Sequence, residues 1–132
     1  MSGEVARVHA LARVAVAFVW IYHGLVPKVL GPHEDELRLA ALHGLPEDHL
    51  SSLLRAAGAL EIVFGIAILV LRRSRWPFVV SAAALVALLI DVAAVAPEYL
   101  WATFNPVSLN AAVIALSVIG FLTAGRATGT SA

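Results

Sequence analysis

The sequence predicts an all-α protein, a four-helix antiparallel transmembrane bundle. Hydrophobic residues make up 61% of its 132 residues and charged residues only 14%, and its mean hydropathy is +0.89. Soluble domains are usually about 45–50% apolar and about 25% charged, so a soluble core of this length could not bury the excess. The apolar residues fall into four segments, each near the ~20 residues that cross a bilayer, at residues 8–30, 53–71, 76–96 and 106–123.

Sequence signals mark the ends of these segments. The first begins like a secretory leader, but its apolar run continues to Leu30 and no Ala-x-Ala-type cleavage site follows, so we expect a retained membrane helix. Pro77 and Pro106 fit the first turns of the third and fourth helices, where a missing N–H has no cost. Asn105 is the expected N-cap of the fourth helix. Each helix therefore has a local reason to begin or end where its apolar run does.

The arginine and lysine residues predict the orientation. Six of the nine basic residues lie on one side of the predicted bundle, namely Arg7, Arg13, Arg72, Arg73, Arg75 and Arg126. The positive-inside rule then places both termini in the cytoplasm of a multi-pass plasma-membrane protein. The long loop 31–52 faces outward, and its stretch "DELRLAAL" is compatible with a short helix lying on the membrane. No internal repeat divides the chain, so we expect a single membrane domain over residues 1–132.

Four polar residues within the predicted helices lie at similar depths. At 1.5 Å per residue, His23 is roughly 9 Å and Glu61 roughly 12 Å from the outer end of its helix, and Asp91 and Asn110 are each roughly 7 Å from theirs. An ionised carboxylate that faces lipid costs at least ~2.5–3.5 kcal/mol. We therefore expect these side chains to point inward, towards one pocket that opens outward.

Two of these residues are candidate catalytic groups. His23 could donate a hydrogen bond to a quinone carbonyl or relay a proton, and Glu61 could accept or deliver a proton. Each also fits a structural role, as a histidine bonded to a neighbouring helix or as a carboxylate in an ion pair with Lys28. Asp91 either extends the polar site or reaches interfacial water. The predicted ligand-binding set is Trp20, His23, Lys28, Glu61, Asp91 and Asn110.

Other residues are expected to shape the bundle. Small residues let membrane helices approach closely, and Pro27 removes a backbone donor and frees a carbonyl near His23. Asn110 is expected to bond across the bundle. The predicted structural set is Gly24, Pro27, Gly58, Gly65, Asn105 and Pro106.

Several site classes are not expected. The histidines and acids of the loop, His33, Glu34, His43, Glu47 and His49, match no firm metal-ligand spacing. The chain has no cysteine, which excludes thiol–disulfide chemistry and iron–sulfur clusters. Its formal net charge is zero, which indicates no nucleic-acid partner.

An ordered set of stretches resembles the DoxX-like family of small four-helix membrane proteins. The stretches are "WIYHGLVPKVL", "HEDEL", "LRAAGALEIVFGI", "RRSRWPF" and "FNPVSLNAAVIAL". The resemblance implies a membrane bundle with a redox association, since DoxX itself is a membrane subunit of a quinone-linked thiosulfate oxidase. The architecture is also similar to that of quinone-coupled thiol oxidases, whose cysteine pairs are missing here. The positions that match the family pattern are Gly24, Pro27, Lys28, Glu36, Glu61, Asn105, Pro106 and Asn110.

The resemblance and the polar layer together favour a small redox-associated subunit that binds a quinone or similar lipid-soluble ligand in the outer half of the bundle. Its electron donor would be a soluble or membrane partner at the outward loop, or a bound cofactor. Two alternatives stay open. One is a non-enzymatic assembly subunit that docks a partner through that loop, and the other is a proton or small-solute conduit formed by an oligomer.

Overall fold

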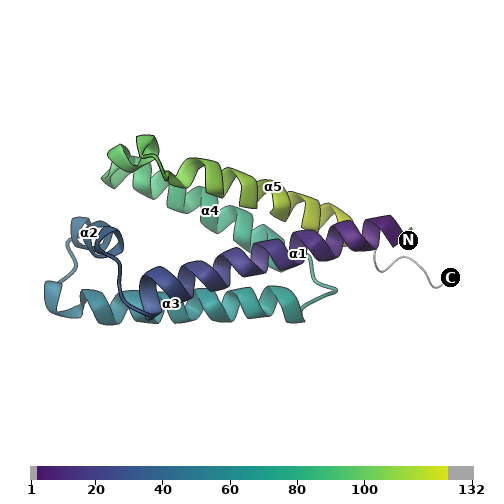
Figure 1. Cartoon of the computed structure of the whole chain (residues 1–132), viewed down its shortest axis with the longest axis horizontal. Helices are drawn as coiled ribbons and strands as arrows, with labels where there is room; N and C mark the ends of the chain where they lie inside the picture. Colours follow the sequence, from purple (N-terminus) through teal and green to yellow (C-terminus); the bar gives the residue numbers. More distant parts are fainter. Residues whose placement is uncertain (1–2, 125–132) are drawn as a thin grey trace.

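Four long helices, one short helix and two single helical turns make up residues 3–124, the part of the chain that the computed structural model describes (Figure 1). The long helices are α1 (Gly3–Gly24), α3 (Glu47–Val70), α4 (Trp76–Val95) and α5 (Pro106–Ala124). The π-helical turn η1 (Leu25–Val29) extends α1, and α2 (Glu34–Leu42) and the 3-10 turn η2 (Pro97–Trp101) lie in the connections. The predicted all-α class with four membrane-length helices is confirmed.

The connection after α1 is more structured than the sequence suggested. α3 begins at Glu47, within the predicted loop, because Pro46 precedes it and two acidic residues in its first turn favour a helix N-terminus. The short helix expected in this loop is present as α2, and its backbone ends in a turn at Gly44, where φ is +71°. Instead of lying free on the membrane, α2 contacts α3 and α4.

The helices are arranged as two pairs. α1 packs along α3, α5 packs along α4, and α1 also packs against α5 (Figure 1). The pairs meet at the end of the molecule that holds Gly3 and Ala124, here called the proximal end, and they diverge towards the opposite, distal end, which carries α2 and η2. The buried core fills the region where the pairs meet, and its residues are Val16, Ala17, Trp20, Ile68, Phe78, Leu85 and Val113.

Two glycines allow the close crossing of α1 and α3. A Cβ atom added to Gly58 would lie 2.5 Å from the carbonyl oxygen of Gly24 and 2.7 Å from Cβ of Lys28. Gly65 of α3 also faces α1. A Cβ atom added to it would lie 2.9 Å from the carbonyl oxygen of Ala17. Side chains at these positions would force the two helices apart.

A buried arginine closes the proximal end. Arg13 donates hydrogen bonds to the backbone oxygens of Ile68, Leu71 and Arg72, which satisfies carbonyls left free at the end of α3. Because a guanidinium only donates, His9 accepts from Arg13 through Nε2 and donates from Nδ1 to Oγ1 of Thr123, 2.8 Å away. The sequence had assigned Arg13 only to the orientation signal, and Arg126 of that signal lies outside the described residues.

Candidate functional site

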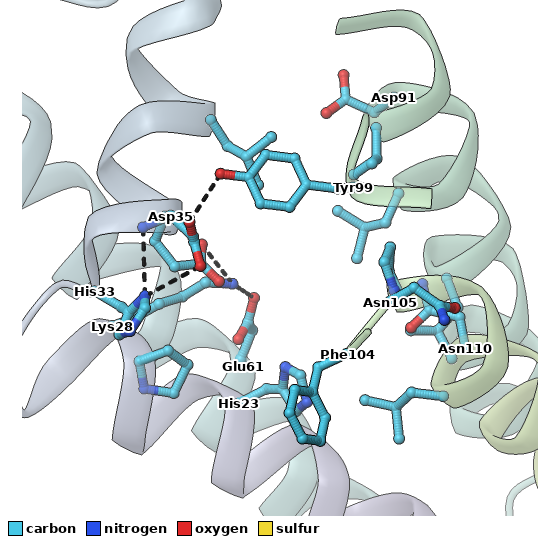
Figure 2. A pocket seen from close by; sticks show the side chains of 18 of the residues that line it. His23, Lys28, His33, Asp35, Glu61, Asp91, Tyr99, Phe104, Asn105 and Asn110 are labelled. Carbon is cyan, nitrogen blue, oxygen red and sulfur yellow. Dashed lines mark hydrogen bonds and ion pairs between the residues drawn. The ribbon is translucent and has the colours of Figure 1, made fainter. Parts of the chain in front are cut away.

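A cavity of about 730 Å³ lies where the two helix pairs diverge (Figure 2). Small-molecule sites usually have volumes of about 300–1,000 Å³, so this one can hold a ligand. Its walls come from α1, η1, α3, α4 and α5, and α2 and the segment after η2 contribute to its distal side. All six residues of the predicted ligand-binding set line it: Trp20, His23, Lys28, Glu61, Asp91 and Asn110.

Lys28 and Glu61 form an ion pair on one wall of the cavity, and their side chains are only 14% and 16% exposed. Lys28 Nζ also lies 3.9 Å from Oε2 of Glu36, so one ammonium stands between two carboxylates. The second oxygen of Glu61, Oε2, is buried and has no hydrogen-bond partner among the described residues. Burial raises the pKa of Glu36 above its ordinary value.

The π-helical turn η1 determines how Lys28 reaches this position. Pro27 has no N–H to donate, and Leu30 N–H bonds instead to Leu25 O, five residues back, at 2.9 Å. The carbonyl of Pro27 accepts from His33 N–H at 2.8 Å, which turns the chain towards α2. Single π-helical turns of this kind are frequent at functional sites.

Trp20 forms the floor of the cavity. Its indole N–H donates to Ser81 Oγ at 2.9 Å, and the hydroxyl of Ser117 donates to the same oxygen at 3.1 Å. Its ring also meets Phe64 edge-on, with 4.9 Å between the ring centroids. Trp20 therefore joins α1, α4 and α5, and it lies where the buried core borders the cavity.

His23 and Asn110 line the cavity from α1 and α5. The His23 side chain is exposed, and Figure 2 shows it beside Glu61. Among the described residues, neither side chain forms a hydrogen bond to another helix, so the cross-bundle bond expected for Asn110 is not present. Both side chains thus keep hydrogen-bonding capacity for a ligand.

Asn105 and Pro106 start α5 beside the cavity. The Asn105 side chain accepts a hydrogen bond from Ser108 N–H at 3.1 Å and donates to Ala102 O at 3.3 Å, and Pro106 is the first residue of the helix. This cap fixes the first turn of α5, and Asn110, which follows that turn, reaches the cavity.

The short helix α2 is joined to η2 by two polar contacts. Arg38 Nη2 donates to Glu98 Oε1 at 2.9 Å, and the hydroxyl of Tyr99 donates to Asp35 Oδ1 at 2.9 Å. The Arg38 guanidinium also lies over the Tyr99 ring, 5.8 Å from its centroid. These contacts hold α2 across the distal end of the divergence.

A third contact joins α2 to α4. His43 bonds through Nε2 to Asp91 Oδ1 at 2.9 Å and through Nδ1 to Leu39 O at 2.7 Å. Both partners are acceptors, so both ring nitrogens act as donors when the imidazole is protonated. The hydrogen bond to Asp91 raises the pKa of His43. Asp91 therefore both lines the cavity and holds α2.

The sequence predicts a short helix lying on the membrane over "DELRLAAL", and none of its residues belongs to the predicted ligand-binding set. Four residues of α2, namely Asp35, Glu36, Leu39 and Ala40, and its C-cap His43 line the cavity. Glu36, Leu39, Ala40 and His43 recur at spacings of three and four. That spacing is the signal of one helical face, and it was present in the sequence.

Within residues 3–124, no group of three histidine, aspartate or glutamate side chains could hold a metal ion.

The comparisons with known proteins give one match. The model of the DoxX-like family matches residues 17–118, which is more than half of the chain and includes α2 and every residue that lines the cavity. No curated protein and no solved structure matches the chain. The protein belongs to the DoxX-like family.

Proposed function

We propose that this protein is a small redox-associated membrane subunit that binds a quinol or similar lipid-soluble ligand in the distal cavity. The observation that carries the proposal is the buried Oε2 of Glu61, which has no hydrogen-bond partner within residues 3–124 and whose other oxygen is paired with Lys28. An unsatisfied buried acceptor costs about 1–3 kcal/mol. A ligand hydroxyl that donates to Oε2 removes that cost, and a quinol supplies such a hydroxyl.

The rest of the cavity suits the same ligand. His23 and Asn110 can bond to a second oxygen on the ligand, and apolar side chains such as Val19 and Leu85 can contact its ring. A few polar groups in a mostly apolar cavity are typical of small-molecule sites. The same groups can bond to the carbonyls of a quinone, with Lys28 and His23 as donors.

Glu36 is the candidate proton-exchange residue of the site. It lies on α2, outside the membrane-spanning helices, and it shares Lys28 with Glu61. Burial raises the pKa of Glu36, so this carboxyl keeps its proton to a higher pH than an exposed glutamate does. In this proposal, the chain binds the ligand and handles protons, and a redox centre of a partner protein exchanges electrons with the ligand.

The partner is proposed to dock at the distal end. The acidic residues Glu34, Glu47 and Asp48 are exposed there, so they are available to a basic surface. This docking site also serves the alternative, non-enzymatic reading, in which the protein assembles a complex. Reversing the charge of these residues should abolish partner capture in both readings, and only the redox reading requires quinol in the cavity.

Ligand content tests the proposal directly. Protein extracted gently and measured by native mass spectrometry should carry quinone or quinol. The double variant Glu61→Gln/His23→Ala should lose it, because both hydrogen-bonding groups are changed. The matched control Glu4→Gln/His49→Ala changes the same residue types at exposed positions outside the cavity lining and should retain it. Equal quinone content in both double variants would contradict the proposal.

We also propose that the protein lies in the plasma membrane with both termini in the cytoplasm, as the arginine distribution indicates. Because the chain has no cysteine, single cysteines report the topology. A membrane-impermeant thiol reagent should label Ser51→Cys in intact cells, and it should label Ser74→Cys only after the cells are permeabilised. The reverse labelling pattern would mean the opposite orientation.

A further inference from the structure

The wall of the cavity is incomplete between the distal parts of α1 and α5, whose proximal parts are in contact. Along α5, the buried residue nearest the distal end is Val113. Beyond it, Leu109 and Ser108 line the cavity and are nevertheless exposed, and His23 on α1 is exposed as well. Exposed residues that also line a cavity mark its rim, which on α4 includes Leu88, 45% exposed.

The two sides of the divergence differ. On the α3–α4 side, α2 contacts both helices, and its polar contacts to Asp91, Glu98 and Tyr99 hold it in place. On the α1–α5 side, the described residues show a side-chain hydrogen bond between the two helices only at the proximal end, between His9 and Thr123. The α1–α5 opening therefore has no polar closure at the distal end.

This opening lies at the depth of the membrane. His23 belongs to the membrane-length span Gly3–Val29, and Leu109 belongs to Pro106–Ala124. Phe104, just before α5, lines the cavity and is 97% exposed. Figure 2 shows Phe104 on the same side of the cavity as His23. A fully exposed phenylalanine at this level is stable in contact with lipid rather than with water.

We infer that the cavity opens laterally into the bilayer between α1 and α5, and that its ligand is an amphiphile with a long apolar tail. The polar head contacts Glu61 and Lys28, and the tail passes Leu109 and Phe104 into the lipid. This inference rests on the proposed function, and it adds the class of ligand and the route of entry. A ligand without a tail would instead enter from water, on the side that α2 covers.

Two probes separate these routes: a benzoquinol with a decyl tail and the same benzoquinol without a tail. Binding is measured on the full chain in lipid nanodiscs. Leu109→Trp narrows the lateral opening and should weaken binding of the tailed probe by about tenfold or more, with little effect on the tailless probe. Leu122→Trp is the matched control, because Leu122 is an exposed leucine of α5 outside the cavity lining, and it should bind both probes like the natural protein.

A second variant covers the case in which Leu109→Trp fails to fold. Ser108→Phe also narrows the opening, and it keeps the backbone N–H that Asn105 caps.

A third variant tests the route on the side of α2. Bridging Arg38→Cys to Glu98→Cys with a thiol-reactive linker fixes α2 to η2 and should leave binding of the tailed probe unchanged.

The outcomes are distinct. Loss of the tailed probe only in the variants that narrow the lateral opening supports the inference. Unchanged binding in those variants, equal loss of both probes, or loss of the tailed probe when α2 is bridged would overturn the lateral route and leave the proposed function standing. Failure of both probes to bind the natural protein would overturn the proposed function and this inference with it.

Discussion

Gly58→Ala is the sharpest test of the crossing between α1 and α3. The added methyl carbon would lie 2.5 Å from the carbonyl oxygen of Gly24 and 2.7 Å from Cβ of Lys28. Non-bonded carbon atoms rest about 3.5–4.0 Å apart. The nearest obstacle is backbone, which cannot rotate away, so the helices must separate by about 1 Å. That movement also shifts Lys28 away from Glu61.

The size of the effect follows from two opposing contributions. Overpacking costs about 1–3 kcal/mol, and a clash with backbone belongs near the upper limit, about 3 kcal/mol. Alanine favours a helix over glycine by about 1 kcal/mol. The net loss in the free energy of unfolding is then about 2 kcal/mol, which lowers the folding equilibrium constant by about 30-fold.

Reversible unfolding in mixed micelles, followed by tryptophan fluorescence, measures this loss. The matched control is Ala59→Gly, because Ala59 is the exposed neighbour on the same turn of α3. It should lower stability by about 1 kcal/mol through helix propensity alone. If Gly58→Ala instead raised stability by about that amount, the close crossing of α1 and α3 would be wrong.

Three further perturbations have defined outcomes. Trp20→Phe removes the hydrogen bond to Ser81 and should lower the free energy of unfolding by about 0.5–1.5 kcal/mol. Asn105→Ala removes the cap of α5 and should cost about 1 kcal/mol in the same unfolding assay, whereas Asn105→Ser should restore most of it. The hydrogen bond to Asp91 raises the pKa of His43. The contact therefore contributes its full stability below the ordinary imidazole pKa of about 6.5, and this stability is lost as pH rises through the raised pKa of His43. Amide protection factors in α2 should therefore fall over that pH range, and Asp91→Asn should remove this pH dependence; pH-independent protection in the natural protein would count against it.

The sequence allowed the polar layer to be predicted because depth along a helix is simple arithmetic. His23, Glu61, Asp91 and Asn110 lie at similar distances from the helix ends, and the structure places all of them on one cavity. The ion pair of Lys28 with Glu61 followed from the same reasoning, since both lie near the same end of adjacent helices.

The role of α2 could not be predicted in the same way. Arg38 bonds to Glu98, and these residues are far apart in the sequence, so no local pattern links them. The sequence indicates which face of α2 is apolar, but it does not indicate which surface of the protein that face covers. Arg13 shows a related difficulty, because an arginine near the end of a membrane helix looks like an orientation signal until its buried carbonyl partners are known.

The buried proximal half closes the cavity of a single chain on the proximal side of the membrane. Below Trp20, the space between the helices is filled by Phe78, which lies against Gly120, and by Ile68 and Val113. A molecule in the cavity of a single chain would have to displace this core to reach the other face of the membrane. The fraction of chains with a ligand in the cavity thus depends on the ligand concentration on the distal side of the membrane only. In the proposed redox assembly, net movement of charge across the membrane then falls to another subunit.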